Sequence, residues 1–297
     1  MTEQRANASR VYQLSVARPI LVPMVLLLVA VVLRVVDIFL LPLAEATGEA
    51  ILHKALGLGM VLVYLWAAGQ PLAAIGLHGR RVGPALFIGA STVILALLIA
   101  FAVQLGALRL AGEQASLALA AIDPKTGLAG AGWGFALWLF VGNLVNSFME
   151  EGLFRGIMLT HFRLRLSPWR ANLLQGIIFG LWHLAWPIWR LVYGHADLPA
   201  VLSESLFILA GSTVSGLLYG YLYLKTDSLW AGWIAHTINN TTLNLLHIRT
   251  TGGLDAGIAL LYPVLALACL ALLFWIKGWA RWLHMPELTP WGASRES

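Results

Sequence analysis

Side chains able to do chemistry gather in three clusters within otherwise apolar runs. In the first, Arg155 follows the adjacent pair Glu150-Glu151, and Asn143 and Asn146 lie seven and four residues before Glu150. The i,i+4 spacing predicts an ion pair between Glu151 and Arg155. Glu150 points about 100° away, onto the face of the two asparagines, and has no local cation. A desolvated carboxylate of this kind suits a general base, although such a charge cluster can also simply anchor a helix end.

The other two clusters each contain a histidine. His183 lies midway along an apolar run and shares a helix face with Phe179. A neutral histidine there can hold a nucleophilic water or bind a metal, or it can simply pack. His236 and Asn240 have the same spacing in a later run, and both can donate hydrogen bonds to a developing oxyanion. Their structural alternative is a hydrogen bond between neighbouring membrane helices.

These clusters stand out because the chain has few charges. Of its 297 residues, 11% are charged and 59% are hydrophobic, and the mean hydropathy is +0.79. Soluble proteins have roughly 25% charged residues, and a soluble fold of this length could not bury so much apolar side chain. The composition excludes a soluble two-domain enzyme and a disordered protein. Because the basic residues form no patch, we also exclude nucleic acid and expect a lipid bilayer as the surroundings.

Apolar runs long enough to cross a bilayer predict transmembrane helices. Eight such runs predict an all-α polytopic bundle without a sheet, because open strands cannot span lipid. With both termini in the cytoplasm, 12 of the 19 basic residues face the cytoplasm and five, including Lys54, face the other side. Arg34 and Asp37 predict a structural ion pair in the first run. The predicted runs are 19–43, 51–68, 84–110, 132–160, 171–193, 204–224, 229–247 and 256–276.

We divide the chain into three parts. Residues 1–131 hold the first three spans, residues 132–247 hold spans four to seven with all three clusters, and residues 248–297 hold the last span and a cytoplasmic amphipathic tail. Tryptophans and basic residues in this tail are typical of an interfacial anchor. They are Trp275, Lys277, Trp279, Arg281, Trp282 and Trp291.

The three clusters together resemble a known pattern. E-E-x-x-x-R, then F-x-x-x-H, then H-x-x-x-N, on successive polar-bearing spans, is similar to the CPBP family of intramembrane proteases. That family includes the CAAX prenyl endopeptidases of the Ras-converting type and the Abi proteins. The resemblance covers about 132–247, whereas the first three spans match in hydropathy only. All motif positions are filled: Glu150, Glu151, Arg155, Phe179, His183, His236 and Asn240.

The resemblance implies an intramembrane endopeptidase. Its substrate would be a membrane-associated protein or peptide, such as one with a lipidated, CAAX-like C-terminus. Glu150 would be the general base and would hold the attacking water together with His183. His236 and Asn240 would stabilise the oxyanion. The supporting residues would be Glu151, Arg155 and Phe179.

Two alternatives to this scheme stay open. Glu150, His183 and His236 would also make a zinc set with an open fourth position. Because the chain has no H-E-x-x-H, we expect no cofactor, with zinc as the alternative. The other alternative is a non-proteolytic scaffold or immunity protein. A proton-coupled carrier is disfavoured because the chain shows no internal repeat.

The position of Glu150 also predicts where the site opens. It lies about ten residues before the basic pair Arg163 and Arg165, which marks a cytoplasmic loop under the positive-inside rule. We therefore expect a multi-pass protein of a bacterial-type plasma membrane, with its site open toward the cytoplasm.

Overall fold

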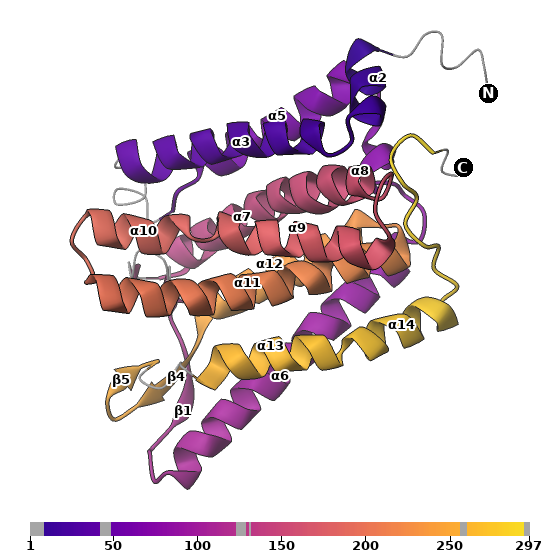
Figure 1. Ribbon diagram of the computed structural model, residues 1–297. Coiled ribbons are helices and arrows are strands. Elements are labelled where there is room, and N and C mark those ends of the chain that lie inside the picture. The colour runs from indigo at the N-terminus through magenta and orange to yellow at the C-terminus, as the bar shows by residue number, and fades with distance from the viewer. Residues whose placement is uncertain (1–8, 42–48, 123–128, 131, 256–259, 294–297) are drawn as a thin grey trace.

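A bundle of long, roughly aligned helices makes up most of the computed structural model (Figure 1). It describes residues 9–41, 49–122, 129–130, 132–255 and 260–293. The first helices are α2 (Arg10–Ala17), α3 (Leu21–Val35) with the π-helical turn η1 (Val36–Leu40), α5 (Leu52–Ala67), the short 3₁₀ turn η2 (Leu72–Ile75) and α6 (Val82–Leu110).

The remaining helices follow in chain order. They are α7 (Trp133–Glu150), the π-helical segment η3 (Glu151–Leu159), α8 (Thr160–Phe162), α9 (Pro168–Trp182), α10 (Ala185–Val192), α11 (Leu198–Thr226), α12 (Leu229–Leu245), α13 (Leu261–Ala271) and α14 (Leu273–Trp282).

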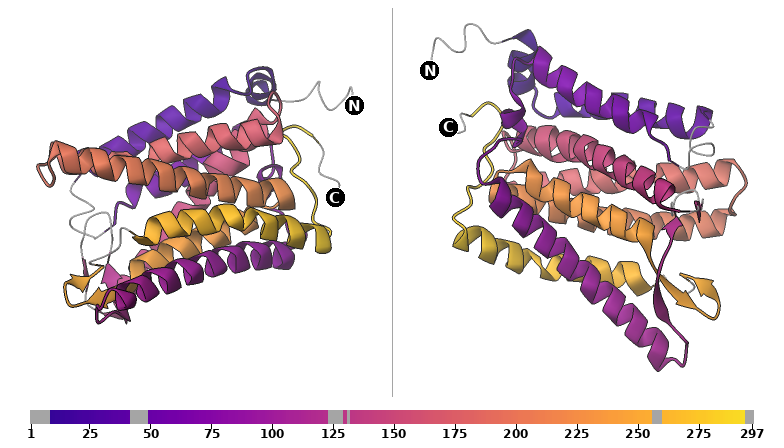
Figure 2. Two further views of the ribbon diagram at one scale, coloured as in Figure 1. Left: turned by 60° about the horizontal axis from the view of Figure 1, so that its bottom comes forward. Right: turned by 180° about the vertical axis from the view of Figure 1, so that it is seen from behind.

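The helices are arranged in layers. The pair α3 and α5 lies on one side of the bundle, and α6 crosses the other side over α12 and α13 (Figures 1 and 2). Between them α7 packs on α5 and α12, and α9 packs on α11. The segment that carries the glutamate pair therefore lies in the middle of the molecule.

Each of the eight predicted runs overlaps a helix or consecutive helices. Four segments in the described ranges are both long and apolar enough to cross a membrane: Leu21–Leu40, Val82–Leu110, Leu198–Thr226 and Leu261–Trp282. Their outward faces expose large apolar side chains, for example Leu28 (63%), Leu98 (62%) and Leu206 (68%). Lipid tails can cover such faces and water cannot, so the chain is an integral membrane protein. The count of eight spans stays a prediction.

The prediction that the chain has no sheet was wrong. Strand β1 (Ser116–Leu119) pairs antiparallel with β4 (Leu246–Thr250), which pairs with β5 (Gly253–Leu254). A second, two-stranded sheet joins β2 (Ala121–Ile122) to β3 (Ala129–Gly130). The β1–β4–β5 sheet lies at one end of the bundle, beyond the helices (Figure 1). Pairing satisfies backbone groups in these connections, so the rule against strands in lipid does not apply to them.

Both terminal regions pack at the opposite end of the bundle. Helix α2 and the C-terminal end of α14 lie at this end, away from the strands (Figure 1). Trp291 Nε1 donates to Ser15 Oγ at 2.9 Å, and the indole stacks on the ring of His161 at 4.3 Å. Trp291 is 2% exposed, so it is a buried packing residue, and its assignment to an interfacial anchor was wrong. Trp282, 68% exposed, remains at the surface.

The glutamate pair occurs where the backbone changes from α- to π-helical geometry. Glu150 is the last residue of α7 and Glu151 the first of η3, whose nine residues are all buried. π-Helical segments of this kind are frequent at functional sites. Gly232 allows α12 to approach here, because a Cβ at that position would lie 2.6 Å from Glu151 Oε2.

Candidate active site

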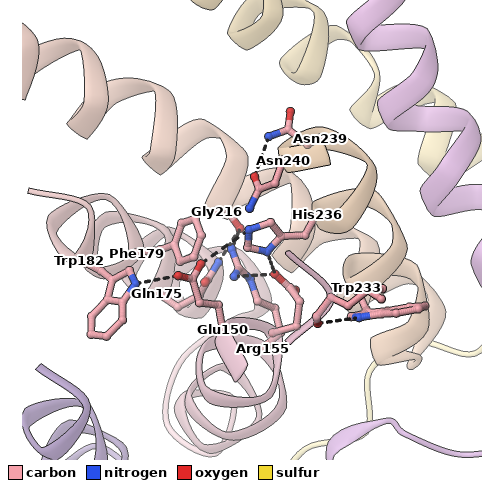
Figure 3. A network of polar contacts seen from close by, with 12 residues as sticks. Glu150, Arg155, Gln175, Phe179, Trp182, Gly216, Trp233, His236, Asn239 and Asn240 are labelled. Carbon is pink, nitrogen blue, oxygen red and sulfur yellow. Dashed lines mark hydrogen bonds and ion pairs between the residues drawn. The ribbon is translucent and has the colours of Figure 1, made fainter. Parts of the chain in front are cut away.

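The structure brings the three sequence clusters to one place in the bundle (Figure 3). Glu150 ends α7, and Glu151 and Arg155 belong to η3. Phe179 lies in α9, and His183 caps that helix at its C-terminal end. His236 and Asn240 come from α12. Segments far apart in the chain therefore converge, as the resemblance to the CPBP family implied.

Glu151 and Arg155 form the predicted ion pair. Arg155 Nη1 donates to Glu151 Oε1 at 2.9 Å, and both side chains are fully buried. Arg155 Nη2 also donates to the carbonyl oxygen of Gly216 at 3.2 Å, and its guanidinium lies 4.2 Å from the centre of the Phe179 ring. A buried charge needs such partners, and these lock Arg155 in place. Glu151 is thus held as a fixed acceptor.

His236 is oriented by this ion pair. Its Nδ1 lies 3.0 Å from Glu151 Oε1, and its ring stacks on Tyr219 at 4.9 Å. Because a carboxylate only accepts hydrogen bonds, Nδ1 carries the proton. The opposite nitrogen, Nε2, then faces Glu150, whose Oε2 lies 3.7 Å away. Through His236, Glu151 and Arg155 position a group beside Glu150.

Glu150 has two oxygens in different surroundings. Trp182 Nε1 donates to Oε1 at 2.9 Å, and Arg34 Nη1 lies 3.8 Å from the same oxygen. Oε2 is buried and has no hydrogen-bond partner among the described residues. Figure 3 shows Trp182 and His236 on opposite sides of this carboxylate. Its nearby cation is not local in sequence, because a distant segment supplies Arg34.

His183 is held in a similar way to His236. Its Nδ1 lies 2.8 Å from the carbonyl oxygen of Phe179, and its ring packs edge-on against the Phe179 ring. A carbonyl only accepts, so the proton again lies on Nδ1 and Nε2 is left for the site. Phe179 thereby supports both His183, through its backbone, and Arg155, through its ring.

A cavity of about 120 Å³ opens beside these groups. Glu150, His183 and Asn240 line it together with Asn143 and Asn146, the two asparagines predicted to share the face of Glu150. Asn240 Oδ1 accepts from Asn239 Nδ2 at 3.3 Å, and its amide nitrogen can only donate. The remaining lining residues are Arg34, His53, Lys54, Trp186, Leu243 and Asn244.

The first two apolar runs contribute a polar group that sequence reasoning missed. Asp37 accepts from the backbone N–H of His53 at 2.8 Å and contacts His53 Nδ1 at 2.7 Å. It does not form the predicted ion pair with Arg34, which instead stacks over Trp182 at 4.3 Å. Lys54 is buried in α5 and paired with Glu49. The sequence feature that could have revealed this group is the presence of Arg34, His53 and Lys54 inside apolar runs.

The alternative zinc set can be tested against this geometry. A zinc site needs its ligand atoms directed at one point about 2.0 to 2.3 Å away. Among the described residues, no group of three or more His, Cys, Asp or Glu side chains is placed so that it could hold a metal ion. Zinc bound by Glu150, His183 and His236 stays a prediction.

Comparison with known proteins gives a family match that spans this part of the chain. Residues 132–242 match the family model of the type II CAAX prenyl endopeptidases, Rce1-like. This segment is a CAAX protease domain. It contains all seven motif residues, from Glu150 to Asn240, and the chain is thus a membrane protein with a domain of a protease family. No curated protein matches the chain.

Proposed function

We propose that the protein is an intramembrane endopeptidase that hydrolyses a peptide bond of a membrane-associated protein or peptide. A C-terminally lipidated, CAAX-like chain is the substrate class that the family description suggests. The observation that carries the proposal is Glu150 Oε2, a buried oxygen without a hydrogen-bond partner among the described residues. It lies 3.7 Å from His236 Nε2, beside a cavity that Glu150 and His183 line. Such an oxygen is available to take a proton from water.

The reaction begins with a water that donates one hydrogen bond to Glu150 Oε2 and the other to His183 Nε2. The water oxygen attacks the peptide carbonyl carbon while one of its protons passes to Glu150. Asn240 Nδ2 donates to the resulting oxyanion. His236 adds a second donor when its Nε2 carries a proton taken up from solvent before the attack, and it keeps that proton throughout. Glu150 then gives its proton to the leaving nitrogen, and the C–N bond breaks. The second water proton passes from the new carboxylic acid to the amine, so a carboxylate and an ammonium group result.

In this scheme Glu151 and Arg155 are positioning residues. Their ion pair holds His236 Nδ1, and through it the direction of Nε2. No step passes through a metal, and we propose that water activation needs no cofactor. Cleavage by protein treated with a strong chelator and shown by elemental analysis to be metal-free would support this, whereas loss of activity restored by zinc alone would contradict it.

Location and direction of access are part of the proposal. We propose a multi-pass protein of a bacterial-type plasma membrane with the site open to the cytoplasm, because most basic residues lie on that side of the predicted topology. Labelling of single cysteines introduced at Arg165 and at Arg249 in intact cells tests this, once Cys269 has been replaced. A membrane-impermeant reagent should label only the variant at Arg249.

Comparison of membranes that contain the wild-type protein or Glu150→Gln tests the function. Wild-type membranes should release peptides, identified by mass spectrometry, that the variant membranes do not release. Glu204→Gln, which removes a carboxylate from a half-exposed ion pair with Arg190, is the matched control. Peptide patterns identical for wild-type and Glu150→Gln would favour the non-proteolytic scaffold or immunity protein.

A further inference from the structure

Arg34 brings a positive charge into the candidate active site from outside the CAAX protease domain. It lies in the last turn of α3, about 100 residues before the matched segment begins. Its side chain is 6% exposed and lines the same cavity as Glu150, His183 and Asn240. The family motifs therefore assign it no role.

The guanidinium of Arg34 has donors without acceptors. It carries five N–H groups, yet it makes no hydrogen bond to any residue that the structure describes, and its Nε is buried without a partner. Its contacts are the face of the Trp182 ring at 4.3 Å and Glu150 Oε1 at 3.8 Å, which exceeds hydrogen-bond length. The Nε of Arg155, the other buried arginine of the site, is also without a partner among the described residues, but both of its terminal nitrogens are bonded.

The neighbours of Arg34 on the cavity wall are also basic side chains. His53 and Lys54 line the cavity beside it, and His53 Nε2 is buried without a partner in the described part of the chain. Lys54 is paired with Glu49 but adds positive charge to the same wall. Leaving a buried guanidinium without acceptors is costly, so the arrangement suits a ligand that brings them.

We propose that Arg34 binds a carboxylate of the peptide substrate in this cavity. A planar carboxylate matches the fork of a guanidinium and accepts two parallel hydrogen bonds from it. The stacking of Arg34 on Trp182 fixes the plane of that fork before the substrate arrives. The carboxylate is either the C-terminus of the substrate or an acidic side chain next to the cleaved bond. This inference rests on the proposed endopeptidase function.

Three fluorescent peptides separate these sources. All carry a farnesylated cysteine followed by three residues. The first ends in three apolar residues and a free carboxylate, the second is its C-terminal amide, and the third is an amide with glutamate directly after the farnesylated cysteine. Cleavage is measured with reconstituted wild-type protein, Arg34→Gln and Arg34→Lys. Arg190→Gln, which removes a guanidinium from a half-exposed ion pair, is the matched control.

The wild-type protein and Arg190→Gln should cleave a carboxylate-bearing peptide at least about 10-fold faster, as kcat/KM, than the plain amide, since charge-assisted hydrogen bonds are the strong ones. Whichever carboxylate peptide is favoured identifies the source. Arg34→Gln should bring the ratio near one through a raised KM, and Arg34→Lys should restore part of it. A preference that survives in Arg34→Gln, or a wild-type protein with no preference, would overturn the proposal.

Peptide binding, measured without cleavage, tests the carboxylate subsite at Arg34 separately from the protease activity. Binding of the same peptides to Glu150→Gln protein, alone and combined with Arg34→Gln, needs no turnover. A carboxylate preference that depends on Arg34 in binding, without cleavage by the wild-type protein, keeps the subsite and rejects the protease. Cleavage without such a preference keeps the protease and rejects the subsite. Thermal unfolding of each variant shows whether it is folded. If Arg34→Gln does not fold, the carboxylate preference of Arg34→Lys is compared with that of the wild-type protein instead.

Discussion

At the residue scale, the two carboxylate oxygens of Glu150 lie in different surroundings. Oε1 is held by the indole N–H of Trp182, whereas Oε2 has no partner in the described residues. One oxygen is thereby fixed and the other is left for water. An aromatic residue next to His183 thus serves the carboxylate through its N–H, as well as the core through its ring.

Trp182→Phe tests this role because it removes the N–H and keeps an aromatic ring. We expect kcat to fall about 10-fold or more with little change in KM, the cost of one hydrogen bond to a charged group. Trp230→Phe is the control, since it removes an indole bond to the backbone of His78 at 3.1 Å, outside the cavity. Equal kcat in Trp182→Phe and wild-type protein would show that Oε1 needs no such support.

At the residue scale, the sequence predicted the contacts that follow helix spacing. The Glu151–Arg155 ion pair is an i,i+4 contact and was predicted correctly. The partners of Glu150 were not predicted, because Arg34 and Trp182 lie 116 and 32 positions away in the chain. The pairing of Asp37 with His53 in place of Arg34 depends in the same way on how α3 and α5 pack.

At the scale of elements, the approach of α12 to η3 decides the position of His236. Gly232, one turn before His236, lets the helix come within contact of Glu151. We expect Gly232→Ala to push the helices apart, to lower the free energy of unfolding by about 1–3 kcal/mol, and to reduce activity at least 10-fold. Detergent-phase thermal unfolding and peptide cleavage measure the two effects.

Gly278→Ala is the matched control for this substitution. A Cβ at Gly278, in α14, would meet nothing within 4 Å. Alanine should therefore be neutral or should stabilise that helix by up to about 1 kcal/mol. If Gly232→Ala behaved like Gly278→Ala, the close contact between α12 and η3 would not matter for the site.

The β4–β5 hairpin outside the helices provides a pH-dependent contact. The hydrogen bond to Asp255, Nδ1 to Oδ2 at 2.6 Å, raises the pKa of His247 above its usual value. A raised pKa means that the ion pair stabilises the fold fully below about pH 6.5 and that this contribution is lost as the pH rises through the raised value.

Asp255→Asn tests this contact, since asparagine tolerates the positive φ of 57° at this position. The variant should be less stable than the wild-type protein at pH 5, and the difference should shrink by pH 9, as measured by thermal unfolding. A stability difference between the wild-type protein and Asp255→Asn that grows with pH would contradict a stabilising ion pair with protonated His247.

The hydropathy pattern predicted the helices well, but it did not predict the strands in the connections between them. Eight apolar runs each contain helix, because apolar composition and length determine where helices form in lipid. The strands β1, β4 and β5 could not be predicted in this way, because they are short and their pairing joins residue 116 to residue 249. The π-helical geometry of η3 likewise has no signal in residue spacing.

At the scale of the whole molecule, the C-terminal segment ties the two ends of the chain together. Trp291 packs against Tyr64 and His161 and bonds Ser15, so α2, α5 and α8 are joined at one end of the bundle. Hydropathy alone could not separate this buried tryptophan from Trp282 at the surface, since both follow the last apolar run.

Trp291→Ala should therefore lower the free energy of unfolding by about 3–5 kcal/mol, the usual cost of emptying a buried tryptophan site. Trp282→Ala, at an exposed position, should change it by less than about 1 kcal/mol in detergent. Thermal unfolding of both variants gives the comparison. Equal losses of stability in the two variants would contradict the buried position of Trp291 and favour the interfacial anchor that the sequence predicted.

Hydrolysis by the purified protein, reconstituted in vesicles, tests the central claim most directly. The rate of cleavage of a farnesylated CAAX-type peptide is compared for the wild-type protein, Glu150→Gln and Glu204→Gln. The account predicts that Glu150→Gln loses at least about 100-fold in kcat while it remains folded and still binds the peptide, and that Glu204→Gln keeps the wild-type rate. Undiminished cleavage by Glu150→Gln would contradict the account.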